Sequence, residues 1–184
     1  MSWIQPVVRT FEKISSSSRL LAWMYSRPYR RVVENEIDLG KLNQNDTILN
    51  IGCGAVPFTA LYLASLTGAR IFALDVDSRA TELANKCIHK AGLEHRITIL
   101  HQDGSQAFER PFSASIVSLQ ASPKAEILKA LQTSALPGAR LIFRLPSAAY
   151  YNHYDSLLIN MPVQAQASQP MRTFDRSVLY LQTG

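Results

Sequence analysis

The chain is poor in cysteine and has no long hydrophobic run. Cys53 and Cys87 are its only cysteines among 184 residues, which disfavours a disulfide framework. No apolar stretch is long enough to span a bilayer, and the N-terminus lacks the apolar core and cleavage site of a signal peptide. No Cys-x-x-Cys pair or histidine pair at ligand spacing is present, so no metal is expected. These absences predict a cytoplasmic protein with reduced thiols.

Acidic residues are scarce at the start of the chain. Residues 1–31 carry six basic side chains and a single acidic one, Glu12, so the formal net charge of +5 resides in this segment. Trp3, Val7 and Phe11 recur there at helical spacing. The pattern fits an amphipathic helix over the domain, a peripheral contact with an anionic membrane, or an organelle transit peptide. We expect the first, a helical lid, and no nucleic-acid partner.

The most informative feature is a glycine-rich turn between a strand and a helix. An apolar run at 48–51 leads into Gly52-Cys53-Gly54, and a helix-forming run follows. Glycine lets the backbone turn sharply and approach a ligand that a Cβ atom would meet. The next apolar run ends on Asp75, whose carboxylate can accept hydrogen bonds from both hydroxyls of a ribose. The spacing predicts the nucleoside-binding half of a doubly wound sheet.

The ligand is not expected to be a dinucleotide, because Pro57 stands where the dinucleotide fingerprint has its third glycine. A further strand leads to Asp103, for which a plain Asp-Gly turn is the alternative interpretation. The order of the glycine turn, Asp75 and Asp103 resembles that of class I S-adenosylmethionine-dependent transferases, in which the second acid holds the adenine amino group. The resemblance implies an S-adenosylmethionine site formed by Gly52, Cys53, Gly54, Pro57, Asp75, Val76, Asp103 and Gly104.

The rest of the sequence alternates short apolar strands with helical segments, which is typical of a parallel sheet covered on both faces. We expect strands at 47–51, 70–74, 96–100, 115–119 and 140–145, and helices at 57–67, 78–91 and 124–133. Asp77 is expected to cap the second of these helices and Gly92 to end it. Two runs at 163–168 and 177–182 are expected to pair as a hairpin. The predicted fold class is α/β, a doubly wound, mostly parallel seven-stranded sheet.

Ahead of the sheet the sequence predicts two short helices, at 19–25 and 28–36, because Pro28 suits the first turn of a helix. A polar turn then leads into the first strand. We therefore divide the chain into an N-terminal helical arm or lid at 1–45 and a nucleoside-binding α/β domain at 46–184.

Three motifs resemble one narrower family, the nicotianamine synthases. Residues 52–59 are similar to its Gly-Ser-Gly-Pro-x-Pro-x-Thr loop, and residues 137–144 to its Pro-Gly-Ala-x-Leu-x-x-Arg strand. Tyr25, Tyr29 and Glu36 are spaced like its Tyr-x-x-Asn-Tyr…Glu helix. The resemblance covers residues 25–182. It implies transfer of the 3-amino-3-carboxypropyl group of S-adenosylmethionine to a small amine or amino-acid acceptor, with release of methylthioadenosine.

The resemblance also suggests roles for individual side chains. Tyr29 and Glu36 are the catalytic candidates, with an aromatic anchor and a surface carboxylate as the respective alternatives. Arg144 is expected to bind a carboxylate of the acceptor, unless it pairs with a nearby acid. Tyr150 and Tyr151 follow the fifth strand and are expected to line the acceptor site.

The sequence departs from the family at its start, where nicotianamine synthases carry a long helical domain that supplies much of the acceptor site. Only 24 residues precede Tyr25 here, so the acceptor cavity is expected to be smaller, more open, or completed by another subunit of a homo-oligomer. Two further hypotheses stay open: a small-molecule methyltransferase on the same fold, and a nucleoside-binding subunit without catalysis.

Overall fold

The computed structural model describes residues 19–156 and 162–182. Residues 1–18 of the expected arm at 1–45, to which the lid, membrane and transit-peptide interpretations apply, lie outside the described residues. Within the described ranges, no helix is both long and apolar enough to cross a bilayer.

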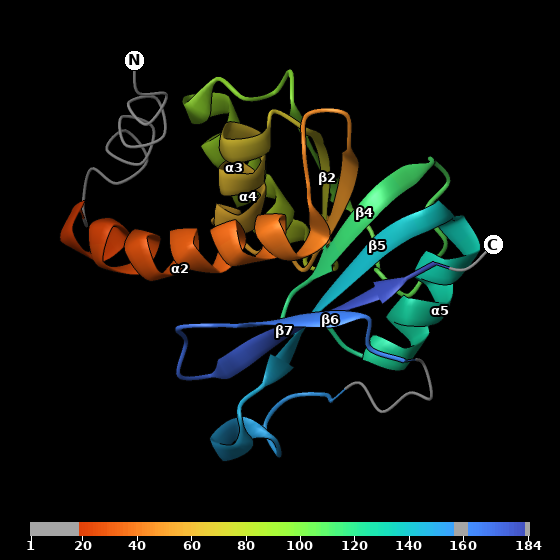
Figure 1. Ribbon diagram of the computed structural model, residues 1–184. Helices are drawn as coiled ribbons and strands as arrows, with labels where there is room; N and C mark the ends of the chain where they lie inside the picture. The colour runs from red at the N-terminus through yellow and green to blue at the C-terminus, as the bar shows by residue number, and fades with distance from the viewer. Residues whose placement is uncertain (1–18, 157–161, 183–184) are drawn as a thin grey trace.

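A seven-stranded sheet in the order β3-β2-β1-β4-β5-β7-β6 forms the centre of the molecule (Figure 1). The first five strands in the chain run parallel, and β7 inserts antiparallel between β5 and β6. This is the predicted fold class, including the terminal hairpin. The strands are β1 (Thr47–Ile51), β2 (Arg70–Asp75), β3 (Ile97–His101), β4 (Phe112–Val117), β5 (Ala135–Pro146), β6 (Ala165–Ser168) and β7 (Phe174–Leu181).

Helices cover both faces of the sheet, because the central strands bear apolar side chains on both sides. Helices α2, α3 and α4 lie on one face and α5 on the other (Figure 1). Ile48 of β1 packs in the first layer, and its neighbour Leu49 packs in the second. The helices are α2 (Arg19–Gly40), α3 (Phe58–Thr67), α4 (Ser78–Ala91), α5 (Lys124–Ser134) and a 3-10 turn η1 (Ala148–Tyr150).

The predicted boundaries of α4 are confirmed with their capping chemistry. Asp77 Oδ1 accepts hydrogen bonds from the backbone N–H groups of Arg79 and Ala80, at 2.8 and 3.3 Å. Gly92 ends the helix in the left-handed region, with φ of 67°. The caps fix where the chain leaves Asp75, and therefore where the carboxyl end of β2 lies.

The prediction of two helices before the sheet is wrong, because α2 is one continuous helix that includes Pro28. The fixed φ of proline is compatible with a helix, and its missing N–H removes only one hydrogen bond. Tertiary packing of the helix compensates for that loss: Val32, Val33 and Glu36 are completely buried. The helix thus belongs to the core of the sheet domain along residues 32–36.

The bounds of β4 and β5 also differ from the prediction. β4 begins at Phe112 and ends at Val117, earlier than expected, so residues 118–123 form a loop at its carboxyl end. β5 begins at Ala135 and continues through Gly138, whereas the predicted strand begins at 140. Gly138 does adopt a φ of 76°, but its N–H still bonds to the carbonyl of Gln182, so pairing with the chain after β7 holds the segment extended.

Candidate functional site

The turn after β1 has the conformation for which glycine is suited. Gly52 and Gly54 have φ values of 77° and 67°, in the left-handed region. A Cβ atom on Gly52 would lie 2.2 Å from the Ser118 hydroxyl oxygen, whereas one on Gly54 would meet open space. Two backbone N–H groups of the turn, those of Gly52 and Cys53, donate to the carbonyl of Leu74 at 2.9 and 3.0 Å. The turn is therefore fastened to the end of the neighbouring strand.

The carboxylate of Asp75 stands at that strand end. Its Oδ2 accepts a hydrogen bond from the N–H of Gly54 at 2.7 Å, and its Oδ1 accepts one from the N–H of Asp77 at 3.1 Å. Both donors are backbone groups, so each oxygen keeps a lone pair for a further hydroxyl donor. Asp75 is thus held in a fixed orientation by the two loops that flank it.

Asp103 lies at the next strand end, inside a tight turn. Its Oδ1 accepts hydrogen bonds from the N–H and the hydroxyl of Ser105, both at 2.8 Å, so the Asp-Gly turn we considered as an alternative is present. A Cβ atom on Gly104 would lie 2.4 Å from Ile51, which explains the glycine by close packing on the end of β1. That close approach brings Asp103 toward the cavity beside the glycine turn.

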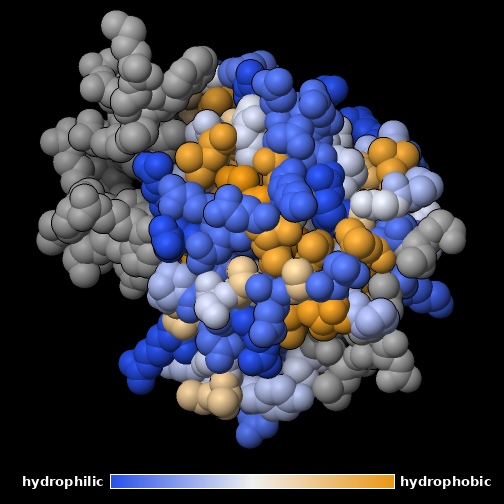
Figure 2. Space-filling view, in the orientation of Figure 1, coloured by the Kyte–Doolittle hydropathy of each residue, from blue (hydrophilic) through white to orange (hydrophobic). Residues whose placement is uncertain are grey.

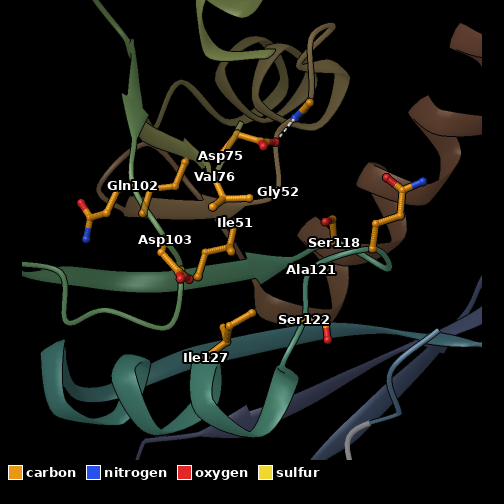
Figure 3. Close-up of a pocket in the computed structure, with 14 residues that line it drawn as sticks. Ile51, Gly52, Asp75, Val76, Gln102, Asp103, Ser118, Ala121, Ser122 and Ile127 are labelled. Atoms are coloured by element: carbon orange, nitrogen blue, oxygen red, sulfur yellow. Dashed lines mark hydrogen bonds between the residues drawn. The ribbon is translucent and has the colours of Figure 1, made fainter. Parts of the chain in front are cut away.

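A cavity of about 200 Å³ lies between these strand ends. Six of the eight predicted cofactor-binding residues line it: Gly52, Gly54, Asp75, Val76, Asp103 and Gly104. Figure 3 shows Asp75 and Asp103 on one side of the cavity, with Ser118, Ala121 and Ser122 on the other. Val76 is 68% exposed, so it presents an apolar surface to a ligand.

Two predicted cofactor residues, Cys53 and Pro57, are absent from the lining. Cys53 is buried, and burial together with the negative charge of Asp75 raises the pKa of its thiol to about 12. Pro57 is buried directly before α3. Both side chains thus pack in the interior, on the side of the turn away from the cavity.

Sequence reasoning did not assign the opposite wall of the cavity. That wall comes from the loop after β4 and the start of α5, with Ser118, Gln120, Ala121, Ser122 and Ile127. The hydroxyl oxygen of Ser118 is buried and makes no hydrogen bond with the described part of the chain. The sequence did offer a signal for this wall, because ligands bind at the carboxyl ends of strands beside the topological switch point of such sheets. We predicted the end of β4 at 119 instead of Val117, so the residues of the loop were not recognised as a wall of the site.

Glu36 and Arg144 form a buried ion pair, which revises both assignments. Arg144 Nε and Nη2 donate to Glu36 Oε1 and Oε2 at 2.8 and 2.7 Å, and Ser177 donates to Oε1 at 2.8 Å. Their side chains are 1% and 0% exposed. Burial alone lowers the pKa of Arg144, but the adjacent Glu36 charge raises it above its usual range, so the guanidinium stays charged. In this structure Glu36 is no surface carboxylate or free base, and Arg144 is occupied by an internal acid rather than by an acceptor.

Tyr29 belongs to the same buried assembly. The Arg144 guanidinium lies 5.5 Å from the centroid of the Tyr29 ring and 5.6 Å from that of Phe174, within range of a cation–π contact on each. The Tyr29 ring also lies 5.8 Å from that of Phe58, at the start of α3. These contacts correspond to the aromatic anchor that we considered beside a catalytic hydroxyl.

Tyr150 and Tyr151 lie beyond the end of β5, but neither lines the cavity. The Tyr150 ring lies against those of His153 and Tyr154, at 5.9 and 6.5 Å between centroids. Tyr151 is 45% exposed, and its hydroxyl accepts a hydrogen bond from Ser156. The structure thus gathers an aromatic segment at the same end of the sheet as the cavity.

The described ranges contain no cluster of three or more histidine, cysteine, aspartate or glutamate side chains able to hold a metal ion. Hydrophilic side chains border the hydrophobic ones gathered near the middle of the face drawn in Figure 2. Six of the predicted cofactor residues and the loop after β4 converge on the cavity at the strand ends.

Comparison with solved structures shows where this arrangement occurs elsewhere. The chain aligns with a crystal structure of MtNAS in complex with MTA and tNA at a TM-score of 0.80 and 18% identity, covering 98% of this chain and 71% of the other. It aligns with an RNA methyltransferase from Salinibacter ruber at a TM-score of 0.67 and 15% identity, covering 83% and 91%. At these identities the likeness establishes a shared fold.

Sequence comparison gives a narrower result. An L-histidine 2-aminobutanoyltransferase of Yersinia pestis is 28% identical over 120 residues, and one of Pseudomonas aeruginosa is 26% identical over 113 residues. These matches cover 65% and 61% of this chain but 45% and 43% of the relatives, so the chain spans under half the length of the curated relatives it matches. Residues 13–164 match the family described as nicotianamine synthase protein, and the chain belongs to that family.

Proposed function

We propose that the protein is an S-adenosylmethionine-dependent transferase that moves the 3-amino-3-carboxypropyl group to a small amino-acid or amine acceptor. The observation that carries this proposal is the cavity in which Asp75 and Asp103 flank the Gly52–Gly54 turn, in a chain of the nicotianamine synthase family. The names of the relatives support an acceptor of the size and chemistry of histidine.

The adenosine part of the cofactor fits the two acids of the cavity. Asp75 has free lone pairs for the two ribose hydroxyls, because its observed hydrogen bonds come from two backbone N–H groups. Val76 offers an apolar surface for the adenine ring, and Asp103 an acceptor for the adenine amino group. Ser118 lines the cavity, and we propose that its hydroxyl, which has no hydrogen-bond partner among the described residues, turns toward the aminoacyl end. In this arrangement the sulfonium lies between the glycine turn and the loop after β4.

The reaction then needs positioning more than chemical activation. A neutral acceptor nitrogen attacks the carbon of the aminocarboxypropyl group next to the sulfonium. The new nitrogen–carbon bond forms as the carbon–sulfur bond breaks. The electron pair of the broken bond stays on sulfur, which gives neutral methylthioadenosine. The nitrogen loses one proton to solvent or a nearby base. Because the sulfonium is already a good leaving group, holding acceptor and carbon in line supplies much of the acceleration.

The ion pair of Glu36 and Arg144 serves this reaction indirectly. We propose that it fixes α2 on the sheet, with the Tyr29 ring resting on the guanidinium. Tyr29 keeps a proposed role for its hydroxyl at the aminoacyl end or the acceptor nitrogen. Tyr150 and Tyr151 are proposed to border the acceptor from the segment after β5.

The identity of the nucleoside product tests the proposal. The protein is incubated with S-adenosylmethionine and histidine or other small amines, and the products are identified by mass. Methylthioadenosine together with an acceptor enlarged by the aminocarboxypropyl group is expected. Adenosylhomocysteine with a methylated acceptor would instead establish the methyltransferase alternative, and neither product would leave a nucleoside-binding subunit.

We further propose that the protein works in the cytoplasm and that a second copy completes the acceptor site. Sedimentation equilibrium with and without cofactor tests the second point, because a strictly monomeric active enzyme would remove it. The proposed N-terminal lid at 1–45 is tested against a membrane contact by deleting residues 1–18. Weakened cofactor binding supports the lid, whereas loss of liposome sedimentation with unchanged cofactor binding supports the membrane contact.

A further inference from the structure

The first residue of α5, Lys124, is completely buried, although lysine is seldom buried. Its ammonium donates hydrogen bonds to the carbonyl oxygens of Leu119 and Ala121, at 2.7 and 2.9 Å. Both carbonyls belong to the loop after β4. Lys124 therefore fastens the loop from behind, between its own helix and the end of the strand.

A second charged side chain reaches the same loop from a distant part of the chain. Asp155 follows the aromatic segment after β5, and its Oδ2 accepts hydrogen bonds from the N–H of Lys124 at 2.5 Å and from the hydroxyl of Ser122 at 3.3 Å. Burial lowers the pKa of Lys124, and the Asp155 charge opposes that shift. The two residues thus form one assembly across 31 positions of sequence.

This assembly lies directly behind the cavity. Ala121 and Ser122 line the wall opposite Asp75 and Asp103 (Figure 3). The Lys124 ammonium bonds to the Ala121 carbonyl, and the Asp155 carboxylate to the Ser122 hydroxyl. A buried charge is a poor means of stabilising a fold, since a hydrophobic residue of similar size often does as well. What the ammonium provides here is two directed bonds that set the shape of a loop.

We propose that Lys124 is a positioning residue that holds the loop at 118–122 as the acceptor-side wall of the cofactor cavity. Asp155 couples that wall to the aromatic segment at 150–154. The proposal rests on the proposed function, because it gives the wall its task of placing the acceptor against the sulfonium. Because Lys124 holds the backbone of this loop, the side chains of the loop keep one arrangement as acceptors bind and products leave.

The first test compares Lys124→Met with Lys129→Met, an exposed lysine on the same helix. Both variants are titrated with methylthioadenosine and assayed for turnover, at a temperature where circular dichroism shows each to be folded. Loss of two charge-assisted hydrogen bonds is expected to raise the Kd of Lys124→Met by about tenfold to a hundredfold. We expect kcat to fall more than the acceptor KM changes, and Lys129→Met to behave as the intact protein. A less stable Lys124→Met with unchanged Kd and kcat would overturn the proposal and leave a purely structural lysine.

The second test does not depend on cofactor binding. Hydrogen exchange is measured in the intact protein and in Asp155→Ala, which also serves if Lys124→Met does not fold. The amides of residues 118–122 and 150–156 are expected to exchange faster together in the variant. Faster exchange in only one of these segments, or in neither, would contradict the coupling. If the intact protein bound no methylthioadenosine, the proposed function would fail, and this experiment alone would decide the inference.

Discussion

The Glu36 carboxylate is completely buried and bonded to an arginine, whereas the Asp75 carboxylate lies at an open cavity and is bonded to two backbone N–H groups. The charge of Glu36 is neutralised inside the protein by Arg144, in an ion pair that joins α2 to β5. The region around Asp75 holds its charge in place and leaves part of its hydrogen-bonding capacity unused. The difference separates a residue that builds the scaffold from one that is available to a ligand.

The comparison also explains why a charged residue near the site need not act on the substrate. Arg144 lies near the carboxyl end of β5, where it could bind an acceptor carboxylate. Its guanidinium already has two carboxylate oxygens and the Thr59 hydroxyl as partners. Releasing it would leave Glu36 charged in an apolar environment, at a cost of several kcal/mol. A free ligand carboxylate would have to compensate for that cost.

Breaking the buried ion pair of Glu36 and Arg144 should produce the largest loss of stability. Arg144→Met leaves the Glu36 carboxylate buried without its partner, and we expect the free energy of unfolding to fall by about 3–5 kcal/mol. Arg30→Met is the matched control, because the ion pair of Arg30 with Glu34 on the same helix is partly exposed. That variant should lose less than about 0.5 kcal/mol. Urea unfolding followed by circular dichroism measures both, and equal losses would contradict a structural role of the buried pair.

Adding a Cβ atom to the glycine turn beside the cavity should have the next largest effect on the free energy of unfolding. The effect should be larger at Gly52 than at Gly54. Gly52→Ala places a Cβ atom 2.2 Å from the Ser118 oxygen at a φ of 77°, whereas Gly54→Ala meets only the conformational penalty. We expect losses of about 2–4 kcal/mol for the first and about 1–2 kcal/mol for the second. Thermal unfolding of the two variants compares them. A Gly54→Ala protein less stable than Gly52→Ala would show that the described turn is wrong.

Neutralising the open carboxylate should weaken binding and spare stability. Asp75→Asn keeps an oxygen for the Gly54 N–H but loses the charge, so cofactor affinity should fall by one to two orders of magnitude, about 1.5–3 kcal/mol. Asp77→Ala should instead lose about 1 kcal/mol of stability, because it removes the cap of α4, with little change in affinity. Calorimetric titration with methylthioadenosine separates the two. Similar affinities for both variants would refute the ribose assignment.

These residues also show what sequence could and could not predict. The strands, the glycine turn, and the acids at 75 and 103 follow from local patterns. Hydrophobic periodicity, turn-forming residues and strand ends all depend on residues that are close together in the sequence. Glu36 and Arg144 are 108 positions apart, and Lys124 and Asp155 are 31 apart. Their pairing depends on how α2 and the segment after β5 pack on the sheet. Local patterns therefore placed Asp75 and Asp103 at the strand ends that border the cavity, but could not distinguish a paired charge from a free one.

The smallest expected effect concerns the thiol behind the open carboxylate. The pKa of Cys53 is raised from 9.0 to about 12 in the folded protein, so between these values the unfolded chain loses the proton while the folded chain retains it. The free energy of unfolding should therefore fall as pH rises through this window, by about 1 kcal/mol between about pH 8 and pH 10. Urea unfolding of Cys53→Ala at the two pH values should show a smaller fall than the intact protein. An equal fall in both proteins would contradict the burial of this thiol beside Asp75.

The fate of each group of the cofactor tests the proposed aminocarboxypropyl transfer most directly. S-adenosylmethionine is supplied with a heavy carbon in its methyl group and a heavy nitrogen in its amino group, together with the acceptor, and both products are analysed by mass. We expect the heavy nitrogen in the enlarged acceptor and the heavy carbon in methylthioadenosine. A heavy carbon in the acceptor, with the heavy nitrogen retained in adenosylhomocysteine, would contradict it.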